Sequence, residues 1–184
     1  WSGAAFLLVA GALAGSVAVT NIDHRSVQAD RTVLDVLEES GAILDITPGK
    51  ITSSVSGLRA FTFDAADSPD LFPPLAALAA RCEGTSRIRG VGRLRHKESD
   101  RAEAIADVLG AMGIHVRFSD DEMVIKGGQV RGAVVSSHND HRIAMMAAVM
   151  AAAAGSVTIT AAEAVAKSYP GFYDDLISLG AIIS

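Results

Sequence analysis

The chain repeats one pattern of elements three times. Gly15, Gly84 and Gly155 each end an Ala-rich helical run, and the spacings between them are 69 and 71 residues. Glycine is common just past a helix C-terminus, because it adopts the left-handed conformation that ends a helix. After each glycine the sequence predicts a short strand and then a second helix. The predicted strands are 16–20, 85–89 and 156–160, and the predicted second helices are 31–40, 101–112 and 172–179.

The repeating unit is helix–strand–helix–strand–strand. Strand pairs are predicted after the second helix of the first two copies, at 43–47 with 50–55 and at 116–118 with 122–125. The copies cover roughly 1–57, 58–127 and 128–184, with the last one cut short. Such a unit is longer than the 20–50 residues or so of solenoid repeats. The sequence therefore predicts a single α/β domain over 1–184, in which three units pack around a common axis with helices inward and sheets outward.

Composition and length agree with one domain that has an aliphatic core. Of the 184 residues, 49% are hydrophobic but only 5% are aromatic, which predicts closely packed Ala, Val, Leu and Ile side chains. The one cysteine, Cys82, excludes an intramolecular disulfide and is predicted to be a structural thiol in a reducing cytoplasm. The apolar runs 4–14 and 143–154 are shorter than the 20 residues or so that span a bilayer. Because the chain begins at Trp1 inside an apolar segment, we expect a fragment of a longer protein.

One basic segment stands out in an acidic chain. The net charge is −5, which argues against a general nucleic-acid binder, yet seven of the 16 Lys and Arg residues lie between Arg81 and Arg101. The densest part, 93–101, precedes an amphipathic helix. Free N–H groups and the helix dipole favour a bound anion at such a place. A solvated turn of mutually paired charges is the alternative.

Two further segments place polar residues immediately before a helix. Asp70 lies at an N-cap-like position, so capping is one interpretation; the other is a general base that accepts a hydroxyl proton. Asp140 and His141 stand at the same place in the third copy, where Asp140 is a candidate cap and His141 a candidate structural histidine. Arg142 is predicted in the first turn of this helix, where a positive charge is unfavourable beside the positive end of the helix dipole. A bound anion would offset this unfavourable interaction.

The repeat brings these residues together. Lys167 follows the third strand as Lys97 follows the second, although a lysine in a loop is usually just solvated. Equivalent positions in the three units would present these cations and carboxylates on one face, as a doubly anionic substrate and a proton transfer require.

No HxxxH or CxxC pattern occurs, and we predict no metal site.

Three motifs in this order resemble a known family. Residues 95–101 read Arg-His-Lys-Glu-Ser-Asp-Arg, 139–145 read Asn-Asp-His-Arg-Ile-Ala-Met, and 167–170 read Lys-Ser-Tyr-Pro. Together they resemble 5-enolpyruvylshikimate-3-phosphate synthases over essentially the whole chain. The resemblance implies an inside-out α/β barrel domain of three βαβαββ units. It also implies that this chain is the C-terminal domain, with the N-terminal domain absent.

The same resemblance implies an activity and site residues. The family transfers the enolpyruvyl group of phosphoenolpyruvate to the 5-hydroxyl of shikimate 3-phosphate and releases phosphate, with no metal or organic cofactor. Asp70 resembles the carboxylate that takes the hydroxyl proton and holds shikimate 3-phosphate. Glu98 resembles the acid that protonates the methylene group, and Lys97 resembles a lysine at shikimate 3-phosphate.

The remaining implied residues bind phosphoenolpyruvate. Arg101 and Arg142 resemble the pair that clamps its carboxylate, and Lys167 resembles a lysine on its phosphate side. No role is transferred to Arg93 or His141. The implied partners are the two substrates and the N-terminal domain of the same protein, in a cytoplasmic enzyme with a monomeric parent and no nucleic-acid or membrane partner.

Two alternatives stay open. The sister enzymes that transfer enolpyruvyl to a UDP-sugar share the fold but rely on a cysteine in their other half. A non-enzymatic scaffold would use the same fold only to bind phosphate or a protein. The fragment alone is expected to fold without catalysing, since the cations of its open face would be uncompensated and the second wall of the site would be missing.

Overall fold

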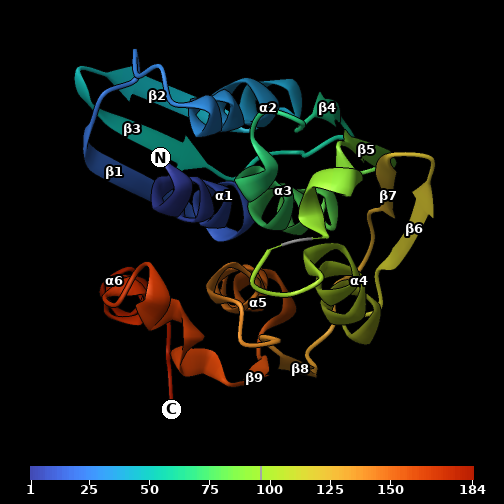
Figure 1. Cartoon of the computed structure of the whole chain (residues 1–184). Coiled ribbons are helices and arrows are strands. Elements are labelled where there is room, and N and C mark those ends of the chain that lie inside the picture. Colours follow the sequence, from blue (N-terminus) through green and yellow to red (C-terminus); the bar gives the residue numbers. More distant parts are fainter. Residues whose placement is uncertain (96) are drawn as a thin grey trace.

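Three small sheets surround a central group of helices (Figure 1). The computed structural model describes residues 1–95 and 97–184. The helices are α1 (Ser2–Ala14), α2 (Val33–Glu39), α3 (Phe72–Ala79), α4 (Arg101–Ala111), α5 (His141–Ala154) and α6 (Phe172–Ser178). The strands are β1 (Ser16–Ile22), β2 (Ile43–Thr47), β3 (Gly49–Ser54), β4 (Thr62–Asp64), β5 (Thr85–Arg89), β6 (His115–Ser119), β7 (Glu122–Lys126), β8 (Val134–Ser136) and β9 (Thr158–Thr160).

The second repeat contains the full unit. Its order is β4-α3-β5-α4-β6-β7, and its strands form one sheet in the order β4-β5-β7-β6. β4 runs parallel to β5, whereas β7 is antiparallel to both of its neighbours. The first repeat supplies a sheet with the order β1-β3-β2, and the third supplies the parallel pair β8-β9. The predicted helix–strand–helix–strand–strand unit is confirmed in the second copy, where β4 supplies the first strand of the βαβαββ unit that the resemblance implies, and β8 is the corresponding strand of the third copy.

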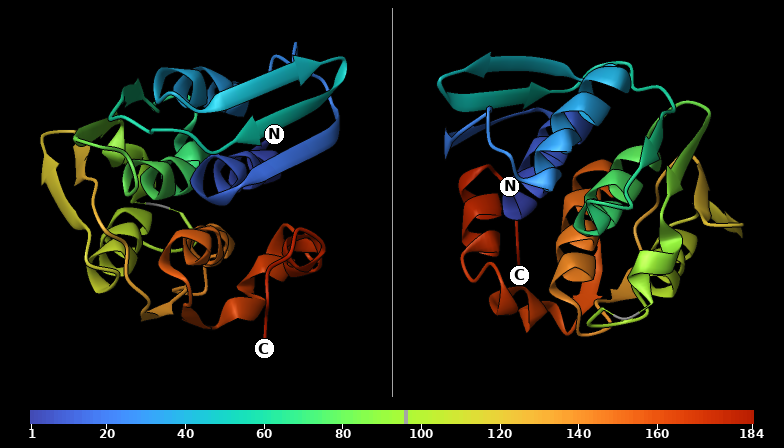
Figure 2. Two further views of the ribbon diagram at one scale, coloured as in Figure 1. Left: turned by 180° about the vertical axis from the view of Figure 1, so that it is seen from behind. Right: turned by 45° about the horizontal axis from the view of Figure 1, so that its top comes forward.

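The first helices of the three repeats form the core. α1, α3 and α5 contact one another, and the views of Figure 2 show the strands outside them. All eight residues of α3 are buried. Prolines 73 and 74 are tolerated there because the first-turn N–H groups have no helical partner. Small residues permit close packing: a Cβ on Gly11 would lie 2.4 Å from the backbone oxygen of Ser53. The predicted arrangement of inward helices and outward sheets is confirmed.

Short 3-10 helices account for most differences from the predicted boundaries. They are η1 (Ala29–Thr32), η2 (Pro69–Leu71), η3 (Val91–Leu94) and η4 (Ala162–Lys167). The helix predicted over 31–40 is divided, because η1 leads into α2 only at Val33. The strand predicted over 156–160 begins at Thr158, where pairing with Val134 of β8 starts. Cross-strand pairing, which comes from another part of the chain, decides this boundary.

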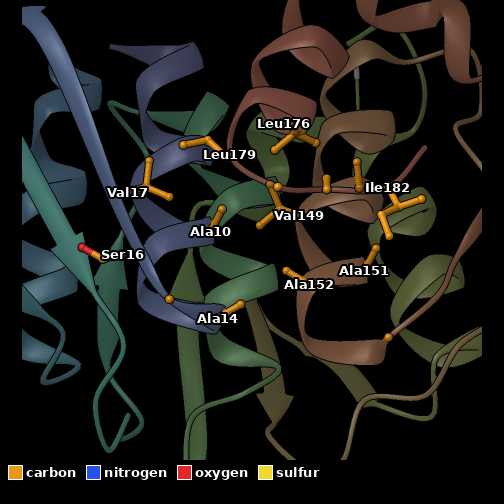
Figure 3. A pocket seen from close by; sticks show the side chains of 15 residues that line it. Ala10, Ala14, Ser16, Val17, Val149, Ala151, Ala152, Leu176, Leu179 and Ile182 are labelled. Atoms are coloured by element: carbon orange, nitrogen blue, oxygen red, sulfur yellow. The ribbon is translucent and has the colours of Figure 1, made fainter.

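An apolar cavity of about 440 Å³ lies between α1, α5 and α6 (Figure 3). Alanines of α1 and α5 line it together with Val17, Val149, Leu176, Leu179 and Ile182. All of its lining residues are uncharged, so this cavity is separate from the charged residues described below. Within the described residues, none of the helices combines the length and apolar character that crossing a bilayer requires.

Candidate active site

The loop that carries the basic segment is anchored by the turn between β6 and β7. The backbone oxygen of Asp121 accepts hydrogen bonds from the N–H groups of Gly90 and Val91, at 2.8 and 3.1 Å. Its carboxylate accepts the N–H of Gly92 at 2.7 Å. Gly90 has a φ of +102°, and a Cβ there would lie 2.9 Å from the backbone nitrogen of Ala66. These contacts fix η3 and direct the chain toward the N-terminus of α4. His96, in this loop, lies outside the described residues.

Arg101, the first residue of α4, lies at the centre of a charged cluster. Its side chain is only 1% exposed. Nε and Nη2 donate to the two carboxylate oxygens of Asp140, at 2.9 and 3.3 Å. Nη1 donates to Asp70 at 3.0 Å, and Nη2 also donates to Glu98. Three carboxylates from three segments therefore surround one buried guanidinium group, as a charge inside a protein requires.

Asp70 binds three cations. In addition to Arg101, Arg142 donates to its Oδ2 at 2.8 Å, and Lys97 Nζ lies 3.4 Å from its Oδ1. Burial raises the pKa of Asp70, but the positive charges of Arg142, Lys97 and Arg101 outweigh it and hold the pKa below the ordinary value. The side chain is still 31% exposed. Asp70 is thus an ionised carboxylate that an incoming substrate can reach.

Asp140 is the buried counterpart of Asp70. It caps α5, because its Oδ1 accepts the backbone N–H of Arg142 at 2.9 Å. Its Oδ2 also accepts a hydrogen bond from Ser99 at 3.1 Å. Burial raises the pKa of Asp140. The hydrogen bonds and charge of Arg101, together with hydrogen bonds from the Arg142 backbone N–H and from Ser99, outweigh this effect and bring the pKa below the ordinary value. The predicted capping role is confirmed, and the residue also pairs with a buried arginine.

Glu98 and His141 face each other near Arg101. His141 Nδ1 lies 3.8 Å from Glu98 Oε1, too far for a hydrogen bond, and this buried nitrogen has no hydrogen-bond partner among the described residues. Burial and the charge of Arg142 lower the pKa of His141, so the imidazole is neutral near pH 7. Glu98 is 41% exposed, in contact with Arg101 and open to a ligand.

Lys167 reaches the same region from η4. Its Nζ donates to the backbone oxygen of Asn139 at 2.5 Å. His138 and Asn139 both have positive φ values, of 51° and 56°. Two successive left-handed residues of this type are uncommon, and such strained backbone is concentrated at functional sites. Lys167 thus lies beside the turn that leads to Asp140.

The structure decides one alternative that the sequence left open and corrects one expectation. Of the two interpretations of Asp70, capping is excluded: neither η2 nor α3 has a side-chain cap, and the carboxylate binds cations instead. The expectation of uncompensated cations is wrong, since Lys97, Arg101 and Arg142 are all paired with carboxylates. Local patterns at 68–74 and 93–101 do not reveal these pairs, because the partners lie about 30–70 residues apart in the chain.

Sequence reasoning missed that Asp140 is the main partner of Arg101. The signal was present in the repeat, because Asp70 and Asp140 occupy the same place in successive copies. Cys82 agrees with its predicted structural role: it is buried, and burial raises its pKa to about 12. A thiol with this pKa is unreactive near pH 7.

A sequence profile described as EPSP synthase (3-phosphoshikimate 1-carboxyvinyltransferase) matches residues 1–176. The chain belongs to the EPSP synthase family. The charged cluster lies inside the matched range, and so do all three motifs on which the resemblance was based.

Curated relatives named 3-phosphoshikimate 1-carboxyvinyltransferase match nearly the whole chain. The Thermococcus kodakarensis protein is 48% identical over 179 residues, covering 96% of this chain and 44% of the relative. A Dehalococcoides mccartyi protein is 42% identical over 180 residues, covering 98% and 43%. The chain therefore spans less than half the length of these EPSP synthase family members.

Solved structures agree with the fold. EPSP synthase from Acinetobacter baumannii superimposes with a TM-score of 0.80 at 32% identity, over 94% of this chain and 44% of that one. The enolpyruvyl transferase NikO from Streptomyces tendae gives a TM-score of 0.78 at 23% identity, over 100% and 43%. At that identity NikO shows a shared fold alone. The inside-out α/β arrangement predicted from the sequence is thus the fold of EPSP synthases.

Proposed function

We propose that this chain forms the C-terminal half of a 3-phosphoshikimate 1-carboxyvinyltransferase. The parent protein transfers the enolpyruvyl group of phosphoenolpyruvate to the 5-hydroxyl of shikimate 3-phosphate and releases phosphate. The observation that carries this proposal is the cluster around Arg101, where three cations and two accessible carboxylates meet. Family membership, relatives of that name and the fold support it.

The two accessible carboxylates divide the proton transfers. Asp70 takes the proton of the 5-hydroxyl group, which then attacks the central carbon of phosphoenolpyruvate. Glu98 gives a proton to the methylene carbon, so that a tetrahedral intermediate forms. In the elimination, Glu98 takes back a methyl proton as the bond between carbon and the phosphate oxygen breaks, and Asp70 returns its proton to the departing phosphate, so that the product forms and both carboxylates are restored. An acid and a base must coexist in one site, and their environments must hold them in different protonation states.

The cations bind the charged groups of both substrates. Arg101 and Arg142 clamp the carboxylate of phosphoenolpyruvate, and Lys167 lies on its phosphate side. Lys97 holds shikimate 3-phosphate beside Asp70. A planar guanidinium group suits a carboxylate because two parallel hydrogen bonds can form. Such positioning lowers the barrier by holding the reacting atoms close together.

Substrate binding changes the basicity of Asp70. Without substrates, Arg142 and Lys97 bind this carboxylate and lower its pKa. When substrate anions take up these cations, Asp70 loses that stabilisation and its pKa rises. A carboxylate with a higher pKa is a better proton acceptor. The ion pairs around Asp70 therefore keep the base inactive until both anions are present.

The other half of the parent protein is the proposed partner. The site formed by residues 70–167 has one wall, and a second domain would supply further cations and exclude water. We place the reaction in the cytoplasm, which the free, buried Cys82 supports, and we propose a monomeric parent. The 184-residue chain alone is expected to release no phosphate, and addition of the N-terminal half in trans is expected to restore release.

Phosphate release by the full-length parent tests the proposal. Shikimate 3-phosphate and phosphoenolpyruvate together should give phosphate, whereas either compound alone should give none. A UDP-sugar acceptor serves as the matched control, because the sister class would use it in place of shikimate 3-phosphate. No release with either acceptor, despite anion binding, would overturn the proposal and favour a scaffold domain.

A further inference from the structure

Asp140 differs from the other carboxylates of the cluster in its burial. Its side chain is 0% exposed, whereas those of Asp70 and Glu98 are 31% and 41% exposed. Substrate can therefore reach Asp70 and Glu98 but not Asp140. The pair between Asp140 and Arg101 is also the one ion pair of the cluster in which both side chains are at most 1% exposed, among the residues that the structure describes.

The way Asp140 binds Arg101 leaves one side of the guanidinium group for a ligand. The carboxylate occupies Nε and Nη2, which form one bidentate edge of the group. The other edge, Nη1 and Nη2, points to Asp70 and Glu98, the carboxylates that a substrate can reach. A substrate carboxylate would bind at this second edge as the side chains of Asp70 and Glu98 turn away.

Asp140 is itself held in one orientation. Its Oδ1 caps α5 through the N–H of Arg142, and its Oδ2 also accepts from Ser99. These bonds come from the start of α5 and from the loop before α4, so they fix the carboxylate relative to both helices. Buried hydrogen-bond networks of this kind, with their members satisfied, make a side chain rigid.

We propose that Asp140 is a positioning residue, which holds Arg101 with its Nη1–Nη2 edge toward the carboxylate of phosphoenolpyruvate. The proposal rests on the proposed function. Asp140 does not touch the substrate and acts only through Arg101. Without it, the guanidinium group would turn about its long side chain and lose the alignment that a bidentate contact requires.

Asp140→Asn in the full-length parent tests this role with little change of shape. The Asn oxygen can still cap α5, because asparagine is a strong N-cap residue. Its NH₂ group, however, would face the Nε–H of Arg101, donor against donor. We expect the KM for phosphoenolpyruvate to rise by about tenfold or more, the loss typical of one charge-assisted hydrogen bond. The KM for shikimate 3-phosphate should change by less than about twofold, within the uncertainty of such contacts.

Asp100→Asn is the matched control. Asp100 makes the same kind of cap at the start of the neighbouring α4, where its side chain accepts the N–H of Glu103, and it is exposed. This variant should keep both KM values. An unchanged KM for phosphoenolpyruvate in Asp140→Asn, or an equal rise for both substrates, would overturn the positioning role.

A double-mutant cycle shows whether Asp140 acts through Arg101. In an Arg101→Gln background, Asp140→Asn should have almost no further effect on phosphoenolpyruvate affinity, measured by titration in the presence of shikimate 3-phosphate. If the two substitutions weaken the affinity independently, so that their fold-changes multiply, the proposal is overturned.

If Asp140→Asn alone does not fold, the double variant should still unfold at a higher temperature than Arg101→Gln, because it removes a buried carboxylate that has lost its main partner. A lower unfolding temperature would overturn the proposal.

The same titrations separate this proposal from the proposed function. If the parent binds phosphoenolpyruvate but releases no phosphate, and Asp140→Asn weakens this binding, the positioning role is supported and the proposed reaction is overturned. Phosphate release by the parent with unchanged affinity in the variant would overturn the positioning role alone. Absence of any phosphoenolpyruvate binding by the unaltered parent would overturn both.

Discussion

The first and second repeats place the same dipeptide at the same position, with different results. Asp30-Arg31 precedes the second helix of the first repeat, and Asp100-Arg101 begins that of the second. Arg31 is 36% exposed, donates to the backbone oxygen of His24 at 2.6 Å and lies 3.9 Å from Asp35. Arg101 is 1% exposed and is bound by three carboxylates.

We call the region around Asp30-Arg31 the first corner and the region around Asp100-Arg101 the second corner. The two corners differ in the carboxylates that the other repeats bring to them. Asp70, from the start of the second repeat, and Asp140, from the third, both reach Arg101. Arg31 has only neighbours from its own repeat as charged partners, among the described residues. A buried arginine needs carboxylates around it, so the second corner is a charged site and the first is ordinary surface.

Asp70→Ala should reduce turnover of the full-length parent by about 10²–10⁴-fold, because general-base catalysis contributes that much. Asp30→Ala, in the first corner, should leave turnover unchanged. Phosphate release measures both, and circular dichroism checks that the variants are folded. Near-normal turnover in Asp70→Ala would show that the base lies elsewhere, and a similar loss in both variants would remove the distinction between the two corners.

Arg101→Met should lower the free energy of unfolding of the 184-residue chain by about 3–5 kcal/mol, since it leaves the buried carboxylate of Asp140 without its main partner. Arg31→Met should cost less than about 1 kcal/mol, as is usual for an exposed pair. Urea unfolding followed by circular dichroism gives both values. Equal losses would mean that burial of the ion pair does not decide its contribution.

Arg101→Lys should weaken phosphoenolpyruvate binding by the parent about tenfold, because lysine keeps the charge but cannot form a bidentate contact. Arg31→Lys should leave the affinity unchanged. Calorimetric titration in the presence of shikimate 3-phosphate measures both dissociation constants. If Arg101→Lys binds as tightly as the unaltered parent, Arg101 is a structural ion-pair residue and not a clamp.

Acid should destabilise the second corner through Asp70. The pKa of Asp70 is lowered in the folded state from its ordinary value of 3.8, so the unfolded chain takes up this proton first as the pH falls. The stabilising contribution is complete well above 3.8 and is lost as the pH passes through the lower folded-state pKa. Unfolding free energies measured from pH 6 downward should therefore fall less steeply in Asp70→Asn than in the unaltered chain. An identical slope would contradict the ion pairing of Asp70.

The sequence by itself predicted the architecture well. A glycine at the same place in three copies, each after an Ala-rich helix, was enough to define the repeat and the inward helices. Element types follow from local periodicity and from termination signals, which lie within about ten residues of one another. The motifs at 95–101, 139–145 and 167–170 likewise identified the family without any structure.

The repeat predicted that these charges share one face, but only the tertiary structure decided which of them pair and which are buried. The sequence left Asp70 between a helix cap and a general base, and only the structure shows that it binds Arg142, 72 residues away. Arg101 looked like one of several exposed cations, yet it is the buried centre of the cluster. Burial and ion pairing depend on side chains that distant segments bring to one place, and local periodicity does not record them. The same dipeptide is therefore a surface pair in one repeat and part of the charged site in the next.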